Sequence, residues 1–314
     1  MTDRFGRDIT YLRLSVTDLC NLRCKYCMPA EGITKRPHRD ILSIEEIEEL
    51  VSAAAQLGIK KVRITGGEPL VRRGIVDICR RVAGTPGISE TCMTTNGTLL
   101  GDFAALLRDA GVSRLNISLD TLNPAQYREI TRGGELATAI YGIKTAREAG
   151  FDNIKINAVL MRGENDGEIR KLVDLTRDSA THLRFIELMP VGSMADFARQ
   201  HFLDNYYVLS VVPELTQTAN DGVARCFKLP GAMGTVGLIS PVSSHFCPSC
   251  NRIRITADGR LKPCLHSADE VTLRGLHGAE LLETMYSAIF NKPQRHHIDR
   301  GTSDSTRDMY EIGG

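Results

Sequence analysis

The chain alternates between short apolar segments and longer amphipathic segments over its first two-thirds. The apolar segments predict six β-strands, at residues 11–16, 61–65, 91–95, 114–119, 153–160 and 183–189. The amphipathic segments between them predict helices, at residues 44–57, 74–82, 103–110, 136–149 and 166–177. Strands joined by crossover helices run parallel in one sheet, so the pattern predicts an α/β fold. Six such units favour a partial barrel over an open doubly wound sheet, although periodicity alone does not separate the two.

Local signals support two of the helices. Ser43 and Glu46 have the spacing of a capping box, in which each residue satisfies the backbone N–H of the other. Gly58 is expected to end the helix that they open. Asn123 followed by Pro124 predicts a further short helix, with asparagine as the cap and proline in the first turn.

The pattern weakens after Pro190, where short apolar runs alternate with glycines and prolines. One more helix is predicted at residues 279–290, because apolar residues fall on one of its faces. The tail, residues 292–314, is polar, and we expect part of it to be mobile. The sequence therefore predicts a barrel domain at residues 1–225 and a C-terminal domain at residues 226–314, which ends in a flexible Gly-Gly tail.

Three cysteines follow the first predicted strand with the spacing C-x3-C-x2-C, at Cys20, Cys24 and Cys27. Three thiolates suit a soft metal, either zinc or an iron–sulfur cluster. A four-iron cluster held by three cysteines keeps one iron open for another ligand, as a catalytic zinc site keeps one open position. The spacing alone is also compatible with a partial zinc site, a disulfide framework or buried small residues.

A second group of three cysteines lies near the C-terminus, at Cys247, Cys250 and Cys264. The first two have C-x2-C spacing, and 13 residues separate Cys250 from Cys264. A structural zinc site needs a fourth ligand, which His245 or His266 could supply. The other interpretation is a second iron–sulfur cluster with an open iron that is available to a substrate.

Composition limits the compartment and the partners. The chain has 314 residues, 42% hydrophobic and 25% charged, and its net charge of +1 argues against nucleic acid or membrane binding. We see no secretory signal and no apolar run long enough to cross a membrane. Nine cysteines favour a reducing, cytoplasmic compartment with metal ligation over disulfides. The three cysteines outside the two motifs are predicted to be buried structural thiols, at Cys79, Cys92 and Cys226.

Several basic residues fall inside the predicted strands, at Arg13, Arg63 and Lys155. A cation inside a barrel strand is costly to bury unless it is paired or meets a ligand. Each of them alone could lie on the solvent-facing side of its strand. Together with Arg252 and Arg254 they favour a pocket for an anion such as a triphosphate, which arginine binds through its bidentate fork.

Tyr26, directly before Cys27, and the Gly66-Gly67-Glu68-Pro69 turn make the chain resemble the radical S-adenosylmethionine (SAM) superfamily. The resemblance implies a (β/α)6 partial TIM barrel. It implies that the open iron of a first [4Fe–4S] cluster chelates the methionine part of SAM. It also implies four residues that line the SAM site, namely Tyr26, Gly67, Ser118 and Met189.

Residues 246–265 are similar to the C-terminal motif of the MoaA family of GTP 3′,8-cyclases, and this likeness extends over nearly the whole chain. It implies a second [4Fe–4S] cluster, held by the second group of cysteines, whose open iron meets the guanine of GTP. It implies GTP contacts from Arg13, Arg63, Thr94, Lys155, Arg252, Ile253 and Arg254. It assigns no single catalytic side chain.

The reaction that this resemblance implies is that of a lyase. SAM is cleaved to a 5′-deoxyadenosyl radical, which removes the C3′ hydrogen of GTP. Closure between C3′ and C8 then gives (8S)-3′,8-cyclo-7,8-dihydroguanosine 5′-triphosphate, in the first step of molybdopterin biosynthesis. The implied partners are an external one-electron donor, a downstream cyclic pyranopterin monophosphate synthase and a second copy in a homodimer. Family members end in two glycines thought to reach the active site, although the residues alone favour a frayed terminus at Gly313-Gly314.

Two other functions are compatible with parts of the sequence. A peptide-modifying radical SAM enzyme would also have an auxiliary cluster, although such enzymes usually carry more C-terminal cysteines. A zinc-stabilised or redox-sensing protein would bind zinc and cleave no SAM. That reading leaves the Gly66–Pro69 turn and the basic residues inside the strands without a role.

Overall fold

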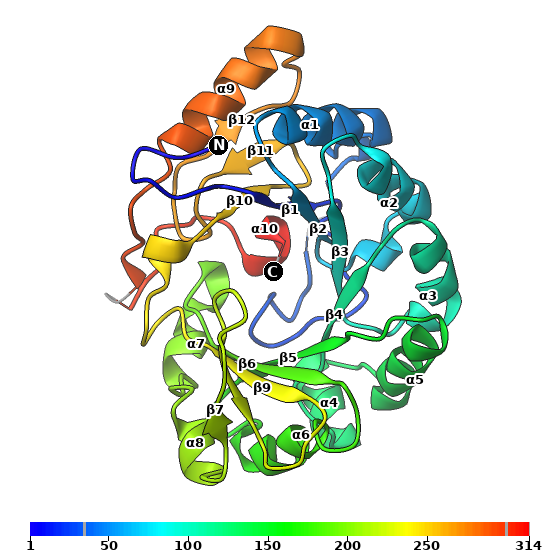
Figure 1. Ribbon diagram of the computed structural model, residues 1–314, viewed down its shortest axis with the longest axis vertical. Coiled ribbons are helices and arrows are strands. Elements are labelled where there is room, and N and C mark those ends of the chain that lie inside the picture. The colour runs from blue at the N-terminus through cyan, green and yellow to red at the C-terminus, as the bar shows by residue number, and fades with distance from the viewer. Residues whose placement is uncertain (34–35, 299–300, 314) are drawn as a thin grey trace.

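The computed structural model describes residues 1–33, 36–298 and 301–313. Six parallel strands form the centre of one curved sheet (Figure 1). They are β1 (Tyr11–Ser15), β2 (Lys61–Thr65), β3 (Glu90–Thr95), β4 (Arg114–Ser118), β5 (Lys155–Leu160) and β6 (His182–Glu187). Each boundary lies within two residues of the one predicted from the sequence. The predicted parallel α/β fold and partial barrel are therefore confirmed.

Helices connect the strands and cover the outer face of the sheet (Figure 1). They are α1 (Ile44–Gln56), α2 (Ile75–Gly84), α3 (Leu100–Asp109), α4 (Pro124–Thr131), α5 (Leu136–Glu148) and α6 (Ile169–Asp174). Their buried faces pack with the strands in one continuous hydrophobic core. Both predicted caps are present. Ser43 and Glu46 form the capping box of α1, and Asn123 accepts hydrogen bonds from the first turn of α4.

The helix predicted at residues 166–177 is wrong in length. A 3-10 turn at Asp166–Glu168 precedes α6, and the chain leaves the helix after Asp174. The backbone N–H of Thr176 bonds to the carbonyl of Val173 three residues earlier, and the Thr176 hydroxyl donates to the same carbonyl. This tighter turn ends the α-helical bonding early.

The C-terminal third adds strands to both edges of the barrel sheet. On one edge, β9 (Thr235–Ile239) lies parallel to β6, followed by antiparallel β8 (Arg225–Lys228) and β7 (Thr216–Gln217). On the other edge, β10 (Arg252–Ile255) lies parallel to β1, followed by antiparallel β11 (Arg260–Lys262) and β12 (Val271–Thr272). In the described part of the chain the sheet has twelve strands, and it is continuous across the predicted domain boundary at 225/226, which falls inside β8.

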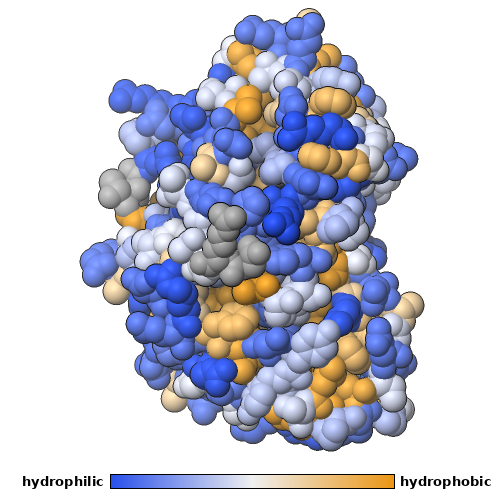
Figure 2. Space-filling model, turned by 90° about the vertical axis from the view of Figure 1, so that its left-hand side faces the viewer, coloured by the Kyte–Doolittle hydropathy of each residue, from blue (hydrophilic) through white to orange (hydrophobic). Residues whose placement is uncertain are grey.

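Three further helices accompany this part of the chain. They are α7 (Ala195–Gln200), α8 (Tyr207–Val211) and α9 (Gly278–Phe290). The third matches the helix predicted at residues 279–290 to within one residue. No helix in the described residues is long and apolar enough to cross a membrane. On the side of the molecule seen in Figure 2, apolar residues lie in separate patches between hydrophilic ones.

The end of the chain returns into the barrel as α10 (Met309–Ile312), and Figure 1 places it inside the ring of strands. Arg307 forms ion pairs with Asp258 and Glu270 at 2.9 and 2.6 Å, and Ile312 is fully buried. The expectation of a frayed terminus is therefore wrong for residues 301–313, because ion pairs and apolar burial hold them. Gly314 lies outside the described residues.

Candidate active site

A cavity of about 470 Å³ lies inside the barrel and is lined by residues from every strand from β1 to β6, as well as from β9 and β10. Both groups of cysteines line it, and none of the nine cysteines forms a disulfide. The cavity also receives Met309 and Tyr310 from the C-terminal helix. The predicted first and second cysteine groups thus share one enclosed space, although more than 200 residues separate them in sequence.

The first cysteine group lies on the loop after β1. The turn from Cys24 to Cys27 is closed by a hydrogen bond from the Cys27 N–H to the Cys24 carbonyl, at 2.9 Å. Burial raises the pKa of Cys20 to about 11 and that of Cys27 to about 12. These thiols therefore need a bound cation to become thiolates near neutral pH.

The turn of Gly66 and Gly67 lies directly against the cysteine loop. The Gly67 N–H donates to the Thr17 carbonyl at 2.8 Å, and the Glu68 N–H donates to the Leu19 carbonyl at the same distance. A Cβ atom on Gly67 would lie only 2.5 Å from the Leu19 carbonyl oxygen. Glycine is required here because the two backbones approach so closely.

Glu68 is buried, and its carboxylate organises the turn. It accepts hydrogen bonds from the Leu70 and Asn96 backbones and from the Thr95 hydroxyl, at 2.7 to 3.0 Å. Burial raises the pKa of this carboxyl to about 7, although the hydrogen bonds oppose that rise. Glu68 therefore joins the turn after β2 to the end of β3.

The four residues predicted for the SAM site all line the cavity. Tyr26 donates a hydrogen bond from its hydroxyl to Asp120 at 2.8 Å, and the Val159 N–H donates to the other oxygen of that carboxylate. Burial raises the pKa of Asp120 to about 6. Ser118 ends β4 and Met189 follows β6, so both lie where parallel strands present ligand-binding groups. Asp120, which no sequence motif had marked, joins Tyr26 to two neighbouring strands.

The second cysteine group has a different electrostatic surrounding. Burial raises the pKa of Cys250, but the positive charges of Lys292 and Arg252 outweigh it and bring the value down to about 7. Arg7 donates to the Cys247 carbonyl at 3.1 Å and so fixes the start of this loop. The thiolate form that metals bind is thus favoured at Cys250 before any metal is present.

Histidines surround the second group. The ring of His296 lies 4.7 Å, centroid to centroid, from the rings of both His245 and His266. Burial and neighbouring positive charges lower the pKa of His266 to about 3, so its ring is neutral. Within the described ranges, no three or more His, Cys, Asp or Glu converge on one metal ion. A four-iron cluster does not need that convergence, because each cysteine binds a different iron.

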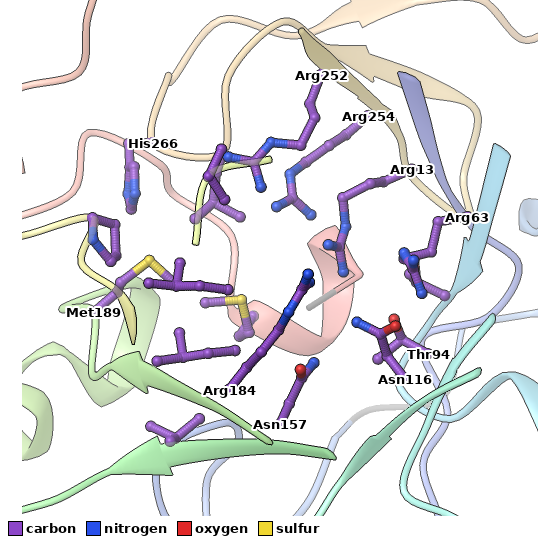
Figure 3. A pocket seen from close by; sticks show the side chains of 18 of the residues that line it. Arg13, Arg63, Thr94, Asn116, Asn157, Arg184, Met189, Arg252, Arg254 and His266 are labelled. Carbon is purple, nitrogen blue, oxygen red and sulfur yellow. The ribbon is translucent and has the colours of Figure 1, made fainter. Parts of the chain in front are cut away.

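Basic residues on three adjacent strands form two rows across the cavity. In the sheet register, Arg13 of β1 lies between Arg63 of β2 and Arg254 of β10, and Tyr11 lies between Lys61 and Arg252. Figure 3 shows the arginines of these rows directed toward the cavity. Burial lowers the pKa of Arg13 to about 10. Like charges in neighbouring strands are unfavourable, so this arrangement suits an anion.

Polar atoms without partners face the same region. Thr94, Asn116 and Asn157 each have a buried side-chain oxygen with no hydrogen-bond partner among the described residues. All three residues line the cavity next to the arginines (Figure 3). A buried oxygen without a partner is costly, so these atoms mark where a polar ligand can bind.

The structure changes the set of residues expected around GTP. Ile253 has no exposed side chain and packs in the hydrophobic core, because side chains alternate along β10 and its neighbours take the cavity face. The GTP contact expected from Ile253 stays a prediction, and it would have to come from the backbone, because the side chain does not line the cavity. Arg184 of β6, which was not predicted from the sequence, lines the cavity opposite the arginines of β1 and β10 (Figure 3). It carries the same signal as Lys155, namely a cation inside a barrel strand.

Known proteins resemble this chain along its whole length. The family model "Radical SAM superfamily" matches residues 14–176, and "Molybdenum Cofactor Synthesis C" matches residues 181–298. Two relatives named GTP 3′,8-cyclase are among the matches. The protein of Alkaliphilus oremlandii is 47% identical, with all of both chains covered. That of Peptoclostridium acidaminophilum is 48% identical over all of this chain and 98% of its own.

The solved structure of Streptococcus suis SuiB bound to S-adenosylmethionine shares the fold, with a TM-score of 0.59. It is 19% identical and covers 90% of this chain, which covers 67% of SuiB. Fold and site thus define a radical SAM protein, a class that uses an iron–sulfur cluster and SAM. Within that class, the chain belongs to the GTP 3′,8-cyclase family.

Proposed function

We propose that this chain is a radical SAM GTP 3′,8-cyclase, a lyase that acts in molybdenum cofactor synthesis. The observation that carries the proposal is the shared cavity, which combines two groups of three cysteines with a row of three arginines across β10, β1 and β2. Full-length relatives with this name support the same reaction. When bound, the first [4Fe–4S] cluster and SAM supply the radical that removes the C3′ hydrogen of GTP before C3′ joins C8.

On the SAM side, Cys20, Cys24 and Cys27 would hold the first cluster. Gly67 would line the methionine end of this site, and only glycine lets this turn lie so close to the cysteine loop, because an added Cβ would collide with the Asp18 and Leu19 carbonyl oxygens. Tyr26 is fixed by its hydrogen bond to Asp120, which orients the aromatic ring toward the cavity. The Asp120 carboxylate adds negative charge to the wall of the cavity beside Tyr26, which would favour a cationic ligand such as the sulfonium of SAM. Ser118 and Met189 would complete the wall of this site.

On the GTP side, Arg13, Arg63, Arg254 and Lys155 would hold the triphosphate, because several cations can share its charge. Thr94, Asn116 and Asn157 would donate to or accept from the nucleotide, which would satisfy their buried oxygens. These contacts would hold the ribose in one orientation and exclude water from the barrel interior.

The C-terminal segment, residues 226–314, would supply the second [4Fe–4S] cluster through Cys247, Cys250 and Cys264, and Arg252 would lie beside it. The open iron of this cluster would meet guanine. Arg254 donates to the Gly313 carbonyl at 2.6 Å, so the penultimate glycine lies beside a predicted GTP residue. This contact supports the expectation that the end of the chain reaches the active site.

The proposed partners follow from the reaction. An external one-electron donor has to reduce the first cluster, and a cyclic pyranopterin monophosphate synthase would consume the cyclised nucleotide. A cytoplasmic location and a homodimer complete the proposal.

The reaction is tested by incubating the anaerobically reconstituted protein with SAM, GTP and dithionite, followed by mass spectrometry. The proposal predicts one 5′-deoxyadenosine formed together with one cyclised nucleotide. SAM cleavage that does not depend on GTP, and that gives no change in GTP, would contradict it. Cleavage stimulated by a peptide instead of GTP would favour the peptide-modifying alternative.

A further inference from the structure

Asp221 holds two of the basic residues of the cavity. One oxygen of its carboxylate, Oδ2, accepts a hydrogen bond from Lys155 Nζ and another from Arg184 Nη2, each at 2.5 Å. Lys155 comes from β5 and Arg184 from the neighbouring strand β6, and all three residues line the cavity. Asp221 itself lies outside the barrel strands, in the turn at residues 218–224 between β7 and β8.

The charges around the cavity are unequal. The described lining residues include eleven arginines and lysines but only four aspartates and glutamates. Three of these carboxylates bond elsewhere. Glu68 accepts from the backbones of Leu70 and Asn96, Asp120 accepts from Tyr26, and Glu187 accepts from the backbones of Val242 and Ser243. Asp221 is therefore the one carboxylate among the described lining residues that ion-pairs with basic residues of the cavity, namely Lys155 and Arg184. From outside the lining, Glu90 pairs with Lys61 and Arg114, and Asp3 pairs with Arg7.

The two sides of this contact differ in how firmly they are held. The side chains of Lys155 and Arg184 are 6% and 14% exposed, whereas that of Asp221 is 54% exposed. Every residue from 216 to 222 is exposed, and a pair of backbone hydrogen bonds between Asp221 and Ala224 closes the turn. Few buried contacts hold this turn in place, so displacing it costs little compared with moving either strand.

We propose that Asp221 is a displaceable counter-ion, which occupies Lys155 and Arg184 until a phosphate group of the substrate replaces it. Before the ligand binds, it neutralises two buried cations that would otherwise be costly to hold side by side. The ligand must therefore bring more negative charge to this pair than one carboxylate supplies. Asp221 makes the site selective for a phosphorylated nucleoside over the bare nucleoside. That the phosphate belongs to GTP rests on the proposed function. The replacement of the Asp221 carboxylate by a phosphate group does not.

The direct test is Asp221→Asn, which keeps the size of the side chain and removes its charge. We would measure binding of inorganic tripolyphosphate, GTP and guanosine by anaerobic calorimetry to the protein with both clusters. Tripolyphosphate and GTP are expected to bind about three- to tenfold more tightly to the variant, since they no longer compete with the carboxylate. Guanosine, which carries no phosphate, is expected to bind equally to both proteins.

Glu214→Gln is the matched control. Glu214 precedes the same hairpin and forms an ion pair with Arg170, but neither residue lines the cavity. This variant removes the same charge and should leave all three affinities unchanged. Equal or weaker binding of tripolyphosphate to Asp221→Asn would overturn the proposal, as would failure of tripolyphosphate to bind either protein.

A second measurement needs no variant. Hydrogen exchange in residues 218–224 should become faster when tripolyphosphate binds the parent protein, because the turn loses its bonds to Lys155 and Arg184. Exchange that stays unchanged or slows would overturn the proposal. If tripolyphosphate behaves as expected but GTP is not cyclised, the counter-ion stands and the proposed function fails.

Discussion

The two groups of cysteines face the same cavity in different electrostatic surroundings. Near the first group, burial raises the thiol pKa values, and the Asp120 carboxylate adds to the rise at Cys27. In the second group, burial also raises the pKa of Cys247, but Lys292 and Arg252 bring the pKa of Cys250 down to about 7. A negative environment suits SAM, whose sulfonium is cationic, and a positive one suits a triphosphate. Electrostatics therefore separates two ligand sites that the cysteine spacing alone does not distinguish.

The largest expected loss of activity comes from Gly67→Ala, which changes only the side of the cavity that holds the first cysteine group. The new Cβ would lie 2.5 Å from the Leu19 carbonyl oxygen and 2.6 Å from that of Asp18, so the first cysteine loop has to move. We expect SAM cleavage to fall by more than about 100-fold, because positioning errors of about 1 Å have effects of that size. The assay is 5′-deoxyadenosine formation. Gly84→Ala is the control, since no atom lies within 4 Å of its added Cβ, and full activity is expected there.

Arg13→Ala should damage the other side of the cavity. It removes the middle cation of the row that joins β10, β1 and β2. We expect kcat/KM for GTP to fall by about 100-fold, because a charge-assisted contact to phosphate is lost. Binding of SAM, measured by calorimetry, should stay within about twofold. Arg80→Ala removes an exposed cation of α2 and should change neither value. A weaker SAM affinity in Arg13→Ala would contradict the separation of the two sides.

The thiols themselves should react at different rates. Cys20 and Cys250 are both partly buried, so access is similar, but their pKa values are about 11 and about 7. At pH 7.5 most of Cys250 is thiolate, whereas very little of Cys20 is. In the metal-free protein, iodoacetamide should modify Cys250 about 50-fold faster, as followed by peptide mass spectrometry, because the roughly 2000-fold advantage in thiolate fraction is partly offset by the lower nucleophilicity of a low-pKa thiolate. Raising the pH to 9 should narrow this ratio, because only the Cys20 thiolate fraction can still grow.

The smallest effect is expected from Asp120→Asn. The amide keeps the size of the carboxylate but removes the negative charge beside Tyr26. We expect the Kd for SAM to rise about five- to tenfold, while the Kd for GTP stays unchanged. A loss of GTP affinity equal to the loss of SAM affinity would show that Asp120 supports the whole cavity and not one side of it.

Much of this arrangement could be predicted from local sequence. Strand periodicity gave β1 to β6, and the basic residues inside strands marked Arg13, Arg63 and Lys155. Arg184 carries the same signal and was missed because β6 was assigned only by its apolar residues. Strands β9 and β10 flank the six central strands and were not predicted, because the short apolar runs among the glycines and prolines after Pro190 have no clear alternation. Their pairing with β6 and β1 joins segments far apart in the chain.

The C-terminal tail and the turn at residues 218–224 show a second limit of prediction from the sequence. Arg307 pairs with Asp258 and Glu270, which lie next to strands β11 and β12 and far from Arg307 in sequence. The sequence therefore did not indicate that the polar tail is held in place. Asp221 lies in an ordinary Asp-Gly turn, and nothing near it in the sequence indicates that its charge meets Lys155 and Arg184. Contacts between segments far apart in the chain carry no local pattern from which they could be predicted.

The central claim is that the cavity holds two iron–sulfur clusters, one per cysteine group, with separate tasks. Iron and sulfide should be counted after anaerobic reconstitution of the parent and of two triple Cys→Ala variants, one for each group. We expect about eight irons in the parent and about four in each variant. Only the variant of Cys247, Cys250 and Cys264 should still cleave SAM, without cyclising GTP. A parent that holds about four irons and one zinc would contradict the second cluster and the guanine-binding role given to it.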